Sequence, residues 1–73
     1  MNPVNSTAFG EAIKARREER RLTQEDVALS AGVGVRFIHD LEHGKPTAEL
    51  ELALRVAAAL GLALRIDDRY SQT

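Results

Sequence analysis

Apolar residues recur every three or four positions along most of this chain, which is the spacing of one face of an α-helix. The pattern predicts an all-α domain of four main helices, followed by a shorter element of different character. The helices are expected from Ser6 or Thr7 to about Arg20, between Thr23 and Gly32, from Val35 to His43, and between Thr47 and Gly61. The fourth helix is expected to face the core with Leu50, Ala53, Leu54, Ala57 and Leu60.

Residues that favour helix ends lie at these boundaries. Hydroxyl side chains before a helix accept hydrogen bonds from its first free N–H groups, and glycine tolerates the left-handed conformation in which many helices end. The predicted caps are Ser6 or Thr7, Thr23 in a capping box with Asp26, and Thr47, and the predicted stops are Gly32, Gly44 and Gly61. Gly10 lies inside the first helix, where it costs about 1 kcal/mol relative to Ala or marks a point of close packing.

Residues 62–67 alternate apolar and polar side chains, which predicts a short β-strand with Leu62, Leu64 and Ile66 on one face. The alternative is that the fourth helix continues through Gly61. A single strand leaves its backbone groups unpaired, so a partner strand must come from a second copy or from another protein. Pairing across the two-fold axis of a homodimer is the simplest arrangement. Residues 1–5 and 68–73 are expected to be flexible, and residues 6–61 to form the domain.

Composition limits the chain to one small domain. It has 73 residues, no cysteine and a net charge of −1, and 44% of its residues are hydrophobic. No disulfide framework, signal peptide or membrane span is apparent, which favours a cytoplasmic protein with no membrane partner. Lysine and arginine gather in residues 11–21, where interspersed glutamates make either a mixed solvated face or a weak phosphate-attracting patch.

Catalytic and metal-binding patterns are lacking in the sequence. His39 and His43 are four residues apart and share a helix face, as two metal ligands could. A zinc site needs three or four ligands, and no cysteine is present to complete one. No nucleophile accompanies these histidines, and no glycine-rich phosphate loop occurs. We therefore expect no enzyme activity, no cofactor and no metal.

The second and third predicted helices are joined by the short turn Gly32–Gly34, which is typical of a helix-turn-helix. This geometry requires a small residue where the helices cross, an apolar residue in the turn, and an apolar residue where the second helix packs. Ala28, Val33 and Ile38 meet these requirements. In such a motif the first residues of the second helix enter the DNA major groove.

The residues around this turn form a distributed pattern over positions 9–62. It comprises Leu22-Thr-Gln-Glu-Asp-Val-Ala28, Ala31-Gly-Val33, Phe37-Ile-His-Asp-Leu-Glu42 and Gly44-Lys-Pro46. The pattern resembles the Cro and phage-repressor (XRE) helix-turn-helix family, whose fold is lambda-repressor-like. The stretch from Gly44 to Leu62, followed by the predicted strand, resembles more narrowly the HipB-type antitoxins, which are repressors that pair with HipA-type kinase toxins.

This resemblance implies a DNA-binding set, which is Gln24, Gly34, Val35, Arg36, Phe37, His39, Asp40 and Lys45. Gln24 and Lys45 would contact phosphate, and Gly34 lacks the hydroxyl that the family usually supplies there. Arg36 would recognise guanine, unless it is an ordinary solvated arginine. Val35 would contact a thymine methyl group. Asp40 would accept a hydrogen bond from the cytosine amino group, orient Arg36, or be an ordinary surface residue. Phe37 is either part of the core or a contact in the DNA groove. Arg17 and Glu42 would form a partly buried ion pair.

Together these features predict a repressor that binds palindromic operator DNA as a homodimer, regulates its own operon and neutralises a HipA-type kinase toxin. The alternatives are a phage-type repressor, a restriction-modification controller, or a pure protein-interaction module. Donors gathered around Gln24, Arg36 and Lys45 favour DNA binding over a pure protein binder. The predicted strand favours the antitoxin, because a plain repressor of this size usually ends in a helix.

Overall fold

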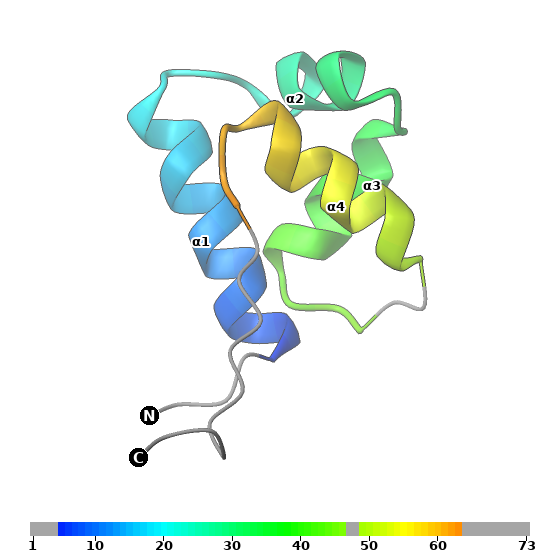
Figure 1. Cartoon of the computed structure of the whole chain (residues 1–73). Helices are drawn as coiled ribbons and strands as arrows, with labels where there is room; N and C mark the ends of the chain where they lie inside the picture. The colour runs from blue at the N-terminus through cyan, green and yellow to red at the C-terminus, as the bar shows by residue number, and fades with distance from the viewer. Residues whose placement is uncertain (1–4, 47–48, 64–73) are drawn as a thin grey trace, which may run out of the picture.

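The computed structural model describes residues 5–46 and 49–63, and this part of the chain contains four α-helices (Figure 1). They are α1 (Ser6–Glu19), α2 (Gln24–Ala31), α3 (Val35–Glu42) and α4 (Leu50–Ala59). The predicted all-helical fold and the order of its helices are confirmed. None of these four helices combines the length and apolar character that crossing a membrane requires.

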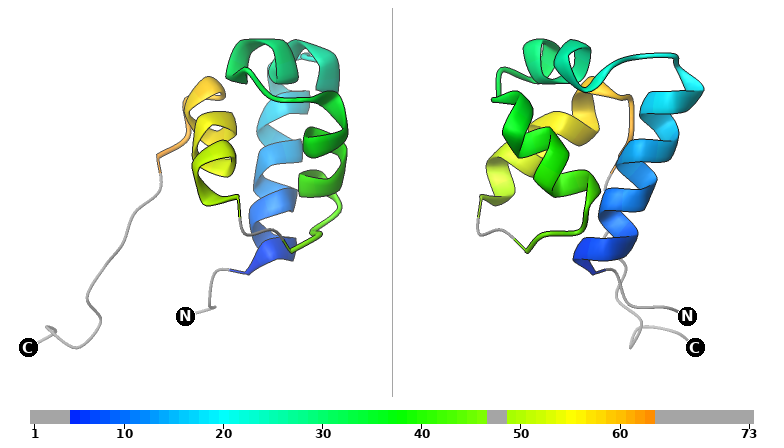
Figure 2. Two further views of the ribbon diagram at one scale, coloured as in Figure 1. Left: turned by 90° about the vertical axis from the view of Figure 1, so that its right-hand side faces the viewer. Right: turned by 180° about the vertical axis from the view of Figure 1, so that it is seen from behind.

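The helices enclose one small apolar core. α1 and α2 both pack against α3, and α2 also packs against α4, while α1 stands beside the others as the longest element (Figure 2). Every helix contributes to the centre, and the largest fully buried side chains are Ile13, Val27, Ile38, Val56 and Leu60. Among the residues that the structure describes, no aromatic ring lies at the centre of the core, which depends on close packing of aliphatic side chains.

The helix starts match the sequence prediction at α2 but not at α1. The Thr23 hydroxyl accepts from the Asp26 N–H at 3.0 Å, and the Asp26 carboxylate accepts from the Thr23 N–H at 2.8 Å, so the predicted capping box is confirmed. At α1 the cap is Asn5, whose side-chain oxygen accepts from Ala8 N–H at 2.8 Å. The prediction of Ser6 or Thr7 was wrong, because an asparagine one position earlier reaches the same amides. Thr47 lies outside the described residues.

All four helices end in the same way, with one residue in the left-handed conformation. These residues are Arg21, Gly32, Gly44 and Gly61. The residue that follows each of them donates its N–H to a carbonyl of the last helical turn, as in Leu22 to Arg17 at 3.0 Å and Leu62 to Ala57 at 2.8 Å. This is the Schellman arrangement, and Leu22, Val33 and Leu62 complete it by packing against the core.

The predicted strand is not seen in the described residues. Leu62, its expected first residue, is instead the apolar residue that closes the end of α4, and residues 62–63 have no strand conformation. The helix does not continue through Gly61 either, because this glycine adopts a φ of 72°. The first residue of the alternating pattern, Leu62, belongs to the motif that caps α4. Alternation of apolar and polar residues does not by itself distinguish such a cap from the start of a strand. Leu64 and Ile66 lie outside the described residues.

The predicted core face of α4 was partly wrong. Ala53, Val56, Ala57 and Leu60 are buried, whereas Leu50 and Leu54 are 64% and 38% exposed. The helix is apolar almost all round, so several stripes satisfy the helical period equally well. The inward stripe is the one that includes Val56, which the sequence prediction omitted.

Gly10 marks the point where α1 crosses α3. A Cβ atom at this position would overlap the carbonyl oxygen of Leu41 and lie 3.1 Å from that of Glu42. Both atoms belong to backbone and cannot move aside without shifting the helix. The close-packing interpretation of this glycine is therefore confirmed.

Replacing Gly10 with Ala should lower the free energy of unfolding by about 1–3 kcal/mol, despite the higher helix propensity of Ala, because α1 and α3 must separate. The melting temperature should fall by roughly 4–8 °C for each kcal/mol. The matched control is Gly34→Ala, since a Cβ at Gly34 meets no atom within 4 Å. A Gly10→Ala chain that is as stable as this control would contradict the close contact.

Candidate nucleic-acid interface

The turn between α2 and α3 has the predicted helix-turn-helix geometry. α2 ends at Gly32 with a φ of 73°, Val33 packs on the core, and Gly34 begins α3. Ala28 and Ile38 are buried on either side of the turn. Gly34 makes no side-chain cap, and the N-terminus of a helix suits an anion such as phosphate.

The outward face of α3 carries the predicted base-reading residues. Arg36 is the most exposed of them, with 83% of its side chain accessible, and Val35 precedes it at the helix start. His39 and Asp40 continue this face one turn later. The structure therefore brings Val35, Arg36, His39 and Asp40 together on one surface of one helix, opposite the buried Ile38.

Asp40 lies among three cationic or basic groups. Its carboxylate oxygens are 3.4 Å from Arg36 Nε, 3.6 Å from Lys45 Nζ and 3.5 Å from His39 Nδ1. Partial burial alone would raise the pKa of Asp40, but the contact with His39 and the charges of Lys45 and Arg36 hold that pKa below its usual range. The carboxylate is thus well placed to orient Arg36, which is one of the roles expected for it.

Lys45 is tied to the same group through its backbone. Its N–H donates to the Asp40 carbonyl at 3.0 Å, in the capping motif that ends α3. This bond fixes where the lysine leaves the helix, while its side chain stays 64% exposed. The position at the end of α3 suits the phosphate contact predicted for Lys45.

Phe37 and the histidines extend this surface. Phe37 is half-buried, packs against the core, and lines a hollow of about 220 Å³ with Leu41, Lys45 and Pro46. The rings of His39 and His43 lie 4.2 Å apart, and His43 Nδ1 is 2.7 Å from the His39 carbonyl oxygen. The pairing of the two rings was not foreseen from their spacing. Among the described residues, no three His, Asp or Glu side chains gather as metal ligands would.

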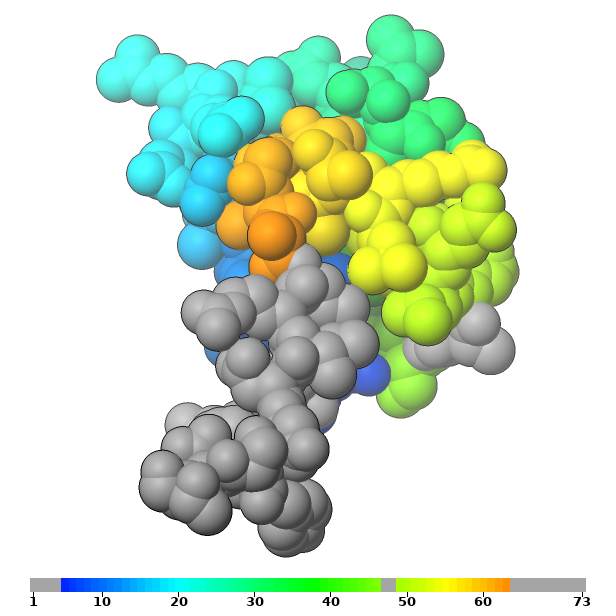
Figure 3. Space-filling view, viewed as in Figure 1, coloured from blue at the N-terminus to red at the C-terminus, as the bar shows by residue number. Residues whose placement is uncertain are grey.

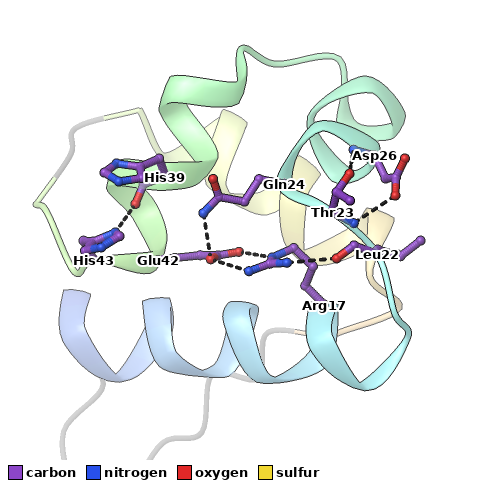
Figure 4. Close-up of polar contacts among 8 residues, drawn as sticks. All are labelled: Arg17, Leu22, Thr23, Gln24, Asp26, His39, Glu42 and His43. Carbon is purple, nitrogen blue, oxygen red and sulfur yellow. Dashed lines mark hydrogen bonds and ion pairs between the residues drawn. The ribbon is translucent and has the colours of Figure 1, made fainter.

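Gln24, the predicted phosphate contact at the start of α2, is half-buried and reaches the carboxylate of Glu42. Its amide nitrogen donates to Glu42 Oε1 at 3.0 Å (Figure 4). The sequence prediction missed this bond, although Glu42 was recognised as a buried acid. The bond leaves the second N–H of the amide for a phosphate, and it fixes the direction in which the side chain lies.

Glu42 and Arg17 form the predicted ion pair. Arg17 Nε and a terminal nitrogen bond the two Glu42 oxygens at 2.6 and 3.0 Å, and the other terminal nitrogen donates to the Leu22 carbonyl at 2.9 Å (Figure 4). Only 1% of the Glu42 side chain is exposed. Burial alone would raise the pKa of Glu42, but hydrogen bonds from Arg17 and Gln24 lower it overall, and the bond to Glu42 raises the pKa of Arg17.

Comparison with known proteins agrees with this geometry. The helix-turn-helix family model matches residues 13–66. The uncharacterized HTH-type transcriptional regulator y4mF of Sinorhizobium fredii is 46% identical over 58 residues, which cover 80% of this chain and 76% of that protein. The chain belongs to the XRE-type helix-turn-helix family. It is a DNA-binding transcriptional regulator.

Two solved structures share the fold. The restriction-modification controller protein C.AhdI from Aeromonas hydrophila is 26% identical, with a TM-score of 0.71 over 80% of this chain and 88% of that chain. The clp gene regulator ClgR from C. glutamicum is 27% identical, with a TM-score of 0.72 over 85% of this chain and 80% of that chain. Both are similar to this chain across the helices that carry the α3 surface.

Breaking the buried ion pair should destabilise the protein strongly. Glu42→Ala leaves Arg17 buried without its partner and should lower the free energy of unfolding by about 3–5 kcal/mol. Replacing both residues with Met removes both charges and should recover most of this loss. Urea unfolding of the two variants and the parent measures the difference.

The same pair should make stability depend on pH. The pKa of Glu42 is lower in the folded chain than its ordinary value of 4.5, so its contribution is fully present above about pH 4.5 and is lost as the pH falls through the folded value. Other carboxylates titrate in both chains, so the informative quantity is the difference between the parent and the double Met variant. An equally steep acid loss in both would contradict the assignment.

Proposed function

We propose that this regulator is a repressor that binds a palindromic operator as a homodimer, with α3 in the major groove and Arg36 as the base-reading residue. The observation that carries the proposal is the α3 surface, where Arg36 is 83% exposed and forms an ion pair with the charged Asp40 one turn later. A guanidinium in this position can take guanine bidentately. The role requires binding alone, with no catalysis and no cofactor, and fits a cytoplasmic protein.

The surrounding residues divide into base and phosphate contacts. Val35 lies one position before Arg36 and offers a methyl surface for thymine. Gln24, Lys45 and the N-terminus of α3 act as phosphate contacts around Arg36, so they set the position of α3 on the duplex. His39 lies on the same face and completes the proposed contact surface.

Arg36→Ala should weaken operator binding by about 1–3 kcal/mol and relax the preference at one base position. Gln24→Ala and Lys45→Ala should weaken binding to all DNA sequences about equally and reduce the salt dependence of binding. A gel-shift series with operator variants at several salt concentrations separates the two effects. Lys14→Ala, an exposed cation on α1, is the control for simple loss of positive charge.

The outcome that contradicts the proposal is a base preference that survives in the Arg36→Ala chain. Unchanged affinity in the same chain would have the same meaning, because the exposed guanidinium would then be only a solvated surface group. The operator is expected to be an inverted repeat whose half-site centres lie about 34 Å apart.

We further propose that the regulator is the antitoxin of a toxin-antitoxin operon and neutralises a HipA-type kinase toxin. Support comes from the pattern between Gly44 and Leu62, which resembles the HipB-type antitoxins. Pairing between two copies belongs to this proposal and concerns residues 64–67 of the expected strand 62–67, because Leu62 caps α4. The second candidate is a restriction-modification controller, which the similarity to C.AhdI favours.

The neighbouring gene distinguishes these two roles. For an antitoxin, it should encode a kinase-like protein that arrests growth when expressed alone, and co-expression of this chain should restore growth. An Arg36→Ala chain should still restore growth, because neutralisation uses protein contacts rather than the base-reading residue. A neighbouring endonuclease and methyltransferase would instead support the controller.

A further inference from the structure

The two histidines at the end of α3 form a ring pair in which the ring nitrogens have different surroundings. Their ring centroids lie 4.2 Å apart, and both residues are exposed. His43 Nδ1 is 2.7 Å from the His39 carbonyl oxygen (Figure 4). A carbonyl oxygen only accepts hydrogen bonds, so the proton of this ring must be on Nδ1. The neutral ring therefore carries its lone pair on Nε2.

The neighbour of His39 gives the same assignment for its ring. His39 Nδ1 is 3.5 Å from Asp40 Oδ1, and an ionised carboxylate also only accepts hydrogen bonds. Each ring thus directs Nδ1 at an acceptor of the protein, and no described residue bonds either Nε2. Histidines that bind metal ions almost always donate their second N–H to a backbone carbonyl or a carboxylate, which fixes the tautomer and orients the ring.

The spacing of the pair suits chelation. Two histidines four residues apart on a helix lie on one face and can bind the same ion. The His39 side chain is 52% exposed, so its ring has room to turn about the Cβ–Cγ bond until both Nε2 atoms meet one ion. Glu42 does not belong to this set, because Arg17 and Gln24 bond its oxygens in the core.

The pair also lies on an open side of the molecule. α4 covers the front of the molecule in the space-filling view (Figure 3), whereas α3 comes to the front in the view from behind (Figure 2). The exposed face of α3 is therefore turned away from α4, and a hydrated ion reaches the two rings without displacing a described helix.

We propose that His39 and His43 bind one divalent transition-metal ion through their Nε2 atoms, with water in its remaining coordination positions. Imidazole suits Cu²⁺ and Ni²⁺, which accept nitrogen and oxygen ligands in open geometries. A structural zinc site takes four protein ligands instead. The expectation of no metal from the sequence rested on that larger number of ligands and did not consider a two-ligand site.

This proposal goes beyond the proposed function and does not rest on it, since metal binding is measured on the chain without DNA. The sequence contains two histidines and no cysteine. Metal binding that depends on imidazole must therefore involve these two rings, provided that the chain carries no affinity tag. This makes the experiment specific to the pair.

The first experiment is calorimetric titration of the full, untagged chain with Ni²⁺ at about pH 8, where imidazoles are mostly neutral. The parent should bind one Ni²⁺ per chain. His39→Gln and His43→Asn should each weaken binding at least about tenfold, because a single imidazole no longer chelates the ion. Mn²⁺ should bind much more weakly than Ni²⁺, because it prefers oxygen ligands. Circular dichroism should show that all these chains keep their helices, since both altered side chains are exposed.

The matched control keeps two histidines but separates them. Glu19 is 74% exposed and lies about 14 Å along α1 from Gly10, where α1 crosses α3. The variant His43→Asn/Glu19→His should bind Ni²⁺ no more tightly than His43→Asn alone. In NMR spectra of the parent, paramagnetic Ni²⁺ should broaden the ring signals of both histidines at lower concentrations than any other side-chain signal.

Three results would overturn the proposal. One is a parent that binds Ni²⁺ no more tightly than the variants with a single histidine. Another is a control with separated histidines that binds as tightly as the parent, and the third is equally tight binding of Mn²⁺, which would indicate carboxylate ligands. Operator binding by the Arg36→Ala chain tests the proposed function separately, so failure of either proposal leaves the other standing.

Discussion

The fold depends on a buried ion pair that joins three of its four helices. Arg17 of α1 holds Glu42 at the end of α3, bonds the Leu22 carbonyl between α1 and α2, and shares Glu42 with Gln24 at the start of α2. A carboxylate that is 1% exposed is tolerated only because each oxygen has a charged or polar donor. The pair therefore sets how α2 and α3 stand relative to α1, which is the geometry on which the proposed contact of α3 with DNA depends.

In α3, buried residues fix the position of the helix, and exposed residues form its outer surface. The helix is fixed from the inside by Ile38 and Glu42, while its outward side chains make only local contacts with one another. Asp40 limits the directions open to Arg36 and is itself held by Lys45. Such ordering before binding reduces the entropy lost when DNA arrives. The side chain proposed to recognise the base, Arg36, is thus oriented without being buried.

Much of the fold could be predicted from local signals. The Thr23–Asp26 box, the glycine stops and the Arg17–Glu42 pair lie where the sequence pattern indicated, because each depends on a few neighbouring residues or on a family-wide arrangement. The inward face of α4 could not be predicted, because its only polar residues are Glu51 and Arg55 and the remaining apolar residues allow more than one apolar stripe. The role of Leu62 was also missed, because one apolar residue after a glycine fits both a strand and a helix cap. The Gln24–Glu42 bond needed three-dimensional placement.

The common ending of the four helices has a consequence for folding speed. Each helix is stopped by a backbone bond at its own last turn, and α2 and α3 each begin within five residues of the end of the helix before them. The chain direction is therefore set locally at the ends of α1 and α2, and little loop-closure entropy opposes the meeting of the helices they join. The contacts of α1 with α3 and of α2 with α4 skip one helix and still close only short loops, and helical domains of this kind reach the native state in about microseconds to milliseconds. We therefore expect this domain to refold quickly after it unfolds, because its helix ends are specified before its helices meet.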